Sequence, residues 1–126
     1  MAHWTTQLDT FTDTNDLSYA TESVLITKGV NFVIKHADAR WLKQSIAGCL
    51  LMFDEIDFIT VTLNTTAASA TLTLRDEHGN VLIQKEELAR FELAEMRFSC
   101  LNMDENWLIM LPSEYAALRA ECAVTE

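Results

Sequence analysis

Residues 27–53 read TKGVNFVIKHADARWLKQSIAGCLLMF and predict two short helices in succession. Thr27 is a suitable N-cap for the first helix, because its hydroxyl can accept a hydrogen bond from a free backbone N–H of the first turn. Gly29 lowers the intrinsic helix propensity, so this helix must depend on tertiary packing. Its packing face is an apolar stripe at three- and four-residue spacing, made of Val30, Val33, Ile34 and Ala37.

The second helix is expected to begin after Asp38, which interrupts the apolar stripe. A carboxylate there would accept from the first N–H groups and would suit the positive end of the helix dipole. One face of this helix is mainly apolar and consists of Trp41, Leu42, Ser45, Ile46, Cys49 and Leu50. We interpret Trp41 as a core residue, and a Trp that stacks on a ligand is the alternative.

After the helices the sequence alternates with a period of two, which predicts strands with one buried face. The apolar members of the first two strands are Ile59, Val61, Leu63, Ala70, Leu72 and Leu74. Further strands are expected over 81–85, 96–100 and 107–111, and residues 24–26 either form a short strand or fill the core. Pro112 ends the last strand, and Ser113 is expected to cap a short C-terminal helix.

The fold class is therefore predicted as α+β, with an antiparallel sheet of four or five strands packed on a pair of N-terminal helices and a short C-terminal helix. A single domain is expected over residues 1–126. Residues 1–23 are rich in Thr, Asp, Asn and Ser, and we interpret them as a loop-rich lead-in that Trp4, Leu8 and Phe11 pin to the core.

Composition restricts the class of partner and the compartment. The formal net charge is −10, which argues against direct binding to nucleic acid or to an anionic membrane. No apolar run approaches the ~20 residues that cross a bilayer, and the N-terminus lacks the features of a secretory signal. The three cysteines are far apart and show no C-x-x-C spacing, which is typical of reduced thiols in a cytoplasmic protein. We expect Cys49 and Cys100 to be buried.

Motifs that carry catalysis are not apparent. There is no phosphate loop, no G-x-G-x-x-G, no G-x-S-x-G and no H-E-x-x-H. His36 with Asp38 and Cys49 matches no familiar metal spacing, and Glu77-His78 is interpreted as an exposed turn. We therefore expect no catalytic residue, no metal site and no cofactor.

Several short motifs resemble a known family. They lie at 27–30, 41–42, 46–47, 79–82, 91–95 and 111–115, and the most specific are Gly-Val followed by Trp-Leu and the closing Leu-Pro-Ser-Glu-Tyr. Over residues 11–115 the chain is similar to a family of small uncharacterised proteins from bacteria, their phages and other mobile elements. The resemblance implies a one-domain fold in the cytoplasm of a bacterial host and transfers no catalytic residue. The segment from Thr12 to Leu17 departs from the aromatic-rich lead-in of that family.

The charge and the resemblance together favour a binding protein without enzymatic activity. On this hypothesis a negative surface replaces phosphates at a basic nucleic-acid-binding site of a host defence protein, such as a CRISPR effector, so that the chain acts as an anti-CRISPR-like inhibitor. The partner-binding candidates are Asp54, Glu55, Asp57, Glu86, Glu87, Asp104, Glu105, Trp107 and Tyr115. The alternatives are a homo-oligomeric structural or regulatory module, such as a homodimer paired through a sheet edge, and a small ligand-binding domain.

Overall fold

The computed structural model describes residues 8, 10–12, 17–66, 69–89, 91 and 93–124. Within them the chain forms seven strands and three helices, in an α+β arrangement. In chain order these are β1 (Leu17–Thr21), β2 (Val24–Thr27), α1 (Lys28–His36), α2 (Arg40–Leu50), β3 (Phe58–Thr65), β4 (Ala70–Arg75), β5 (Val81–Glu87), β6 (Glu95–Asn102), β7 (Trp107–Met110) and α3 (Pro112–Val124).

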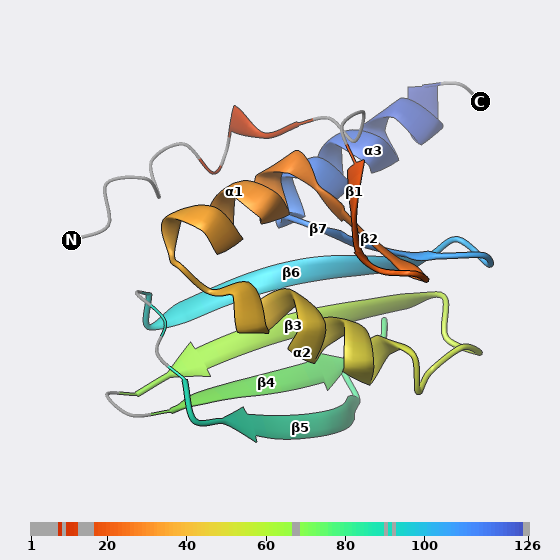
Figure 1. Ribbon diagram of the computed structural model, residues 1–126. Helices are drawn as coiled ribbons and strands as arrows, with labels where there is room; N and C mark the ends of the chain where they lie inside the picture. Colours follow the sequence, from red (N-terminus) through yellow and green to blue (C-terminus); the bar gives the residue numbers. More distant parts are fainter. Residues whose placement is uncertain are drawn as a thin grey trace.

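All seven strands belong to one mixed sheet, in the order β1-β2-β7-β6-β3-β4-β5 (Figure 1). The pair β2–β7 is parallel, and every other neighbouring pair is antiparallel. The predicted α+β class is confirmed, but the prediction of an antiparallel sheet of four or five strands was wrong in strand number and in the direction of the β2–β7 pair. The parallel pair joins segments more than 80 residues apart, and such a pairing leaves no turn signal in the sequence.

Of the two N-terminal strands, β1 lies in the segment that was predicted as a loop-rich lead-in, whereas β2 lies where a short strand or a core-filling segment was expected. Residues 24–26 do form a strand, and β1 pairs with it as a hairpin along the edge of the sheet. The β1 sequence Leu-Ser-Tyr-Ala-Thr is exposed or half-buried throughout, so it lacks the alternation that marks a half-buried strand. Leu8 and Phe11 pack against the core as predicted, whereas Trp4 lies outside the described residues.

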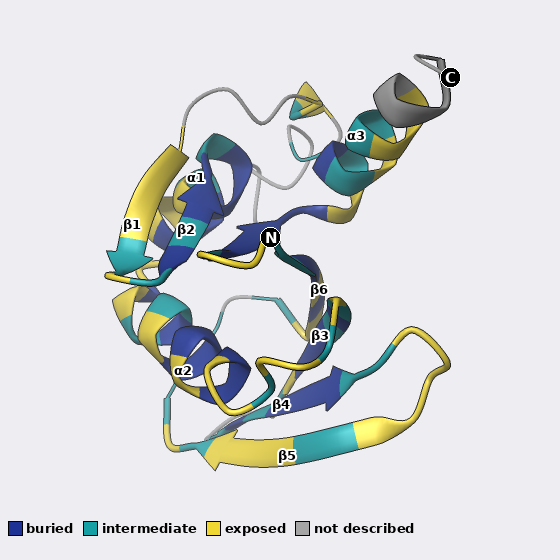
Figure 2. Cartoon of the chain, turned by 90° about the vertical axis from the view of Figure 1, so that its right-hand side faces the viewer, coloured by how far each residue is buried: buried dark blue, intermediate teal, exposed yellow. Residues whose placement is uncertain are grey.

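The helices α1 and α2 pack against the inner face of the curved sheet, and α3 lies on its outer side (Figure 2). The predicted alternation is confirmed on β3 and β4, because Ile59, Val61, Leu63, Ala70, Leu72 and Leu74 are all fully buried. Cys49 and Cys100 are both buried, as predicted. Trp41 is half-buried and packs against the core. The strand β7 is buried on both faces, as expected from its continuous apolar sequence.

The two helix-cap predictions had different outcomes. The Thr27 hydroxyl accepts a hydrogen bond from the Val30 N–H at 3.3 Å, which confirms it as the N-cap of α1. Asp38 does not cap α2, since Ala39 holds the N-cap position without a side-chain bond. Asp38 instead has a positive φ of 50° and closes α1, where the Ala39 N–H donates to the Ile34 carbonyl at 2.9 Å. Asp tolerates this left-handed conformation better than most residues, so it takes the place that glycine usually holds after a helix.

The C-terminal helix differs from the prediction in length and in its start. It begins at Pro112 and runs to Val124, so Ser113 lies inside its first turn and does not cap it. The Ser113 hydroxyl donates instead to the carbonyls of Leu8, at 3.2 Å, and Phe11, at 2.8 Å. Ser113 thereby ties the lead-in to α3.

Candidate functional site

Two loops at one end of the sheet hold most of the predicted acidic residues. The loop between α2 and β3 carries three of them, and the turn between β6 and β7 carries two. We call this surface the acidic end; its members are Asp54, Glu55, Asp57, Asp104 and Glu105, and all five are exposed.

Asn102, at the end of β6, holds the two loops together. Its side-chain amide donates to the backbone carbonyls of Asp54 and Ile56, each at 3.0 Å, and its backbone N–H donates to the Asp57 carbonyl at 2.8 Å. The Asn102 side-chain oxygen accepts from the Asp104 N–H at 2.9 Å, where Asp104 turns the chain at a positive φ of 71°. The carboxylates of both loops are therefore presented on a fixed backbone. The sequence signal for this role of Asn102 was weak, because an Asn before a turn has many possible partners.

Large apolar side chains are exposed beside these carboxylates. Leu51 is 44 % exposed and Met52 58 % exposed on the α2 side, and Met103 is 41 % exposed in the β6–β7 turn. A hollow of about 320 Å³ lies between the two loops, bordered by Leu51, Asp54, Asp104 and Trp107. Apolar and methionine side chains within a polar rim are typical of protein-binding surfaces.

The two aromatic partner-binding candidates are not exposed at the acidic end. Trp107 is only 3 % exposed and belongs to the core cluster, so it supports the acidic end from beneath and does not offer an exposed ring. Its Nε1 is buried without a hydrogen-bond partner in the described part of the chain. Tyr115 stacks on Phe58 on the outer side of the sheet, with the ring centroids 4.6 Å apart.

Glu86 and Glu87 lie on the edge strand β5 and are not part of the acidic end. Glu86 is exposed. The Glu87 carboxylate accepts from the Ser45 hydroxyl at 2.7 Å and pairs with the Lys85 ammonium at 3.0 Å. The Ser45 hydrogen bond and then the Lys85 interaction hold the pKa of Glu87 below its usual value. This residue therefore joins α2 to β5.

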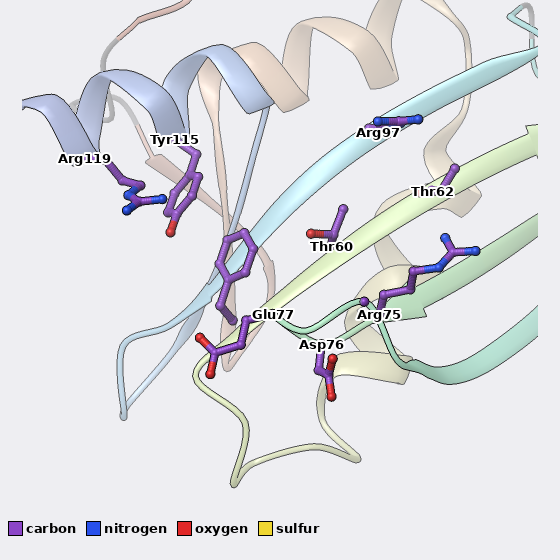
Figure 3. A pocket seen from close by; sticks show the side chains of 10 residues that line it. Thr60, Thr62, Arg75, Asp76, Glu77, Arg97, Tyr115 and Arg119 are labelled. Carbon is purple, nitrogen blue, oxygen red and sulfur yellow. The ribbon is translucent and has the colours of Figure 1, made fainter.

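A second concave surface, which the sequence did not predict, lies on the outer face of the sheet. It has a volume of about 660 Å³, and its lining includes Arg75, Arg97, Arg119, Thr60, Thr62 and Tyr115 (Figure 3). We call it the arginine groove. The three arginines are spread over 45 positions of the chain, so only the strand register and the place of α3 bring them together. The available signal was that Arg75 and Arg97 occupy the polar phase of their strands.

Groups suited to metal or thiol chemistry do not gather in the described ranges. No cluster of three or more His, Cys, Asp or Glu side chains there could hold a metal ion. His36 packs on the ring of Phe32, with centroids 4.2 Å apart. Burial raises the pKa of the Cys49 and Cys100 thiols, so both are held in the unreactive protonated form.

No helix among the described residues is long and apolar enough to cross a membrane. Comparisons with curated proteins and with solved structures found no match. The model of a family of unknown function, DUF6876, matches residues 2–115. Because this match covers most of the chain, the protein belongs to the DUF6876 family.

Proposed function

We propose that the protein is a non-enzymatic binding protein whose acidic end occupies a basic, nucleic-acid-binding surface of another protein. The observation that carries this proposal is the joining of two carboxylate-bearing loops by Asn102. A partner that binds nucleic acid presents Lys and Arg side chains to phosphates, and five carboxylates on a fixed backbone can replace those phosphates.

The overall charge and the exposed apolar residues add to this support. The net charge of −10 accelerates the approach of a basic partner, and it repels nucleic acid that competes for the same partner surface. Leu51, Met52 and Met103 add apolar area next to the charges, so the contact need not depend on Coulomb attraction alone. In the setting implied by the resemblance to phage and mobile-element proteins, the partner is a host defence protein such as a CRISPR effector.

Affinity capture from the lysate of a bacterial host, followed by mass spectrometry, tests this proposal. The tagged wild-type chain is compared with the triple variant Asp54→Asn, Glu55→Gln and Asp57→Asn. A triple variant with the same change of charge elsewhere, Glu77→Gln, Glu86→Gln and Glu95→Gln, is the matched control, because all three are exposed and lie outside the acidic end.

We expect the wild-type chain and the control to capture the same basic nucleic-acid-binding protein and the acidic-end variant to lose it. Equal capture by all three chains would refute the role of the acidic end. A captured partner without a basic nucleic-acid site would refute the proposed mode of binding.

A second candidate function is self-association through an open edge of the sheet. The edge strand β1 exposes Tyr19 at 65 % and Leu17 at 39 %. An unpaired strand edge can pair with a second copy across a two-fold axis, and exposed aromatic residues favour such contacts. Light scattering over a range of concentrations, with Tyr19→Ser as the variant, distinguishes a dimer from a monomer.

A further inference from the structure

The arginine groove is floored by two rows of polar residues that cross three strands. In the first row Thr60 of β3 lies opposite Arg75 of β4, and in the second row Thr62 of β3 lies opposite Arg97 of β6. The intervening residues of β3, such as Val61, point into the core. The floor therefore combines hydroxyl groups with guanidinium groups, and all of them are donors that suit an anionic oxygen.

The positive charge of this groove is only partly neutralised by the protein. Arg75 and Arg119 have no carboxylate within 4.0 Å in the part of the chain that the structure describes, whereas Arg97 pairs with Glu95 at 3.0 Å. Asp76 also borders the groove, but its carboxylate accepts from the N–H groups of His78 and Asn80, both at 2.9 Å. Figure 3 shows the Asp76 and Glu77 carboxylates pointing away from the Arg75 guanidinium.

The groove also has an aromatic end. Phe58 and Tyr115 stack with their centroids 4.6 Å apart, and the Arg119 guanidinium lies 5.8 Å from the centre of the Tyr115 ring. In Figure 3 Tyr115 and Arg119 lie on one side of Thr60, and Arg75 and Arg97 lie on the other. A ligand that fills the groove therefore meets the aromatic rings and Arg119 at one end and the Arg75 and Arg97 guanidinium groups at the other.

We propose that the arginine groove binds a small phosphorylated ligand with a planar ring, of the nucleoside phosphate class. Guanidinium groups bind phosphate oxygens in pairs of hydrogen bonds, the threonine hydroxyls add neutral donors, and the aromatic wall packs against the base. The volume of about 660 Å³ lies within the range of small-molecule sites. A long nucleic acid is a poorer occupant, because the net charge of −10 repels a polyanion.

Isothermal titration calorimetry with the purified chain tests this site. The probes are the four common nucleoside diphosphates, with pyrophosphate as the phosphate without a ring and the nucleosides as the ring without phosphate. We expect at least one nucleoside diphosphate to bind. Pyrophosphate and the corresponding nucleoside, which are the two halves of this ligand, should each bind more than about tenfold more weakly. No binding of any diphosphate, or equal binding of either half alone, would overturn the proposal.

A pair of charge-matched variants locates the binding. The double variant Arg75→Gln, Arg97→Gln should lower the affinity for the nucleotide by more than about tenfold. Arg40→Gln with Lys43→Gln removes the same charge from α2 in the helical layer and should leave the affinity unchanged. Circular dichroism confirms that both variants fold, and equal affinities for the two variants would refute the site.

The proposals for the arginine groove and for the acidic end can be refuted independently of each other. The triple variant Asp54→Asn, Glu55→Gln and Asp57→Asn should keep nucleotide binding, and the Arg75→Gln, Arg97→Gln variant should keep capture of the protein partner. Loss of nucleotide binding in the acidic-end variant would place the nucleotide outside the arginine groove and overturn the inference.

Discussion

At the scale of single residues, Glu114 explains why two separate motifs of the sequence meet in space. Its carboxylate is fully buried and accepts from the Leu111 N–H at 2.8 Å, the Gly29 N–H at 3.3 Å and the Thr27 hydroxyl at 2.5 Å. It therefore occupies the N-terminal ends of α1 and α3 together, where free N–H groups and both helix dipoles favour a negative group. The Thr-Lys-Gly-Val and Leu-Pro-Ser-Glu-Tyr motifs thus build one junction.

Substitution of Gly29 tests how tightly this junction is packed. A Cβ atom at this position would lie 2.7 Å from Leu111 Cδ1 and 2.8 Å from Glu114 Oε1, so Gly29→Ala should lower the free energy of unfolding by about 1–3 kcal/mol. The matched control is Gly48→Ala in α2, where an added Cβ meets no atom within 4 Å. In this control the free energy of unfolding should rise by about 0.5–1 kcal/mol, because alanine has a better helix propensity than glycine. Urea unfolding measures both changes, and a stabilising Gly29→Ala would contradict the packing of Glu114 against α1.

At the scale of elements, Glu87 attaches the edge strand β5 to α2 through Ser45. The Ser45 hydrogen bond and Lys85 hold the pKa of Glu87 below its usual value, so the folded state favours the charged carboxylate. The resulting stabilisation is present in full above the unfolded-state pKa, and it is lost as the pH falls through the lower folded-state pKa.

The variant Ser45→Ala removes the largest cause of this shift. We therefore expect Ser45→Ala to lower the free energy of unfolding at pH 7. Between about pH 5 and pH 3 the free energy of unfolding should also fall less in this variant than in the wild-type chain. Denaturant unfolding at a series of pH values measures both effects, with Glu86→Gln as the control on the same strand. An unchanged pH dependence in Ser45→Ala would show that Glu87 does not join these elements.

Elements defined by local patterns could be predicted, and elements defined by distant pairing could not. The periodicities of β3, β4, α1 and α2 lie in neighbouring residues, and each of these elements was predicted from the spacing of its apolar residues. The parallel pairing of β2 with β7 depends on segments more than 80 residues apart, and β1 is an exposed edge strand. The same distinction applies to the sites: the acidic loops are dense in sequence, whereas the arginine groove exists only once β4, β3 and β6 are in register.

At the scale of the whole molecule, charge is divided between surfaces. The acidic end gathers five carboxylates, the helical layer carries Lys35, Arg40 and Lys43, and the outer face of the sheet carries the arginine groove. Such a distribution orients the molecule as it approaches a charged partner, because opposite charges attract before contact. The protein can therefore present its acidic end to a basic surface in spite of its own basic patches.

This orientation predicts a strong effect of salt on association with the proposed basic partner. Raising the NaCl concentration from about 50 mM to about 500 mM shortens the screening length from about 14 Å to about 4 Å, so the association rate constant should fall by more than about tenfold. The Asp54→Asn, Glu55→Gln, Asp57→Asn variant should associate more slowly at low salt and depend less on salt. The Glu77→Gln, Glu86→Gln, Glu95→Gln variant has the same net charge and should keep most of the wild-type dependence. Biolayer interferometry gives these rates, and if the two variants lost salt dependence equally, net charge and not the acidic end would be steering the encounter.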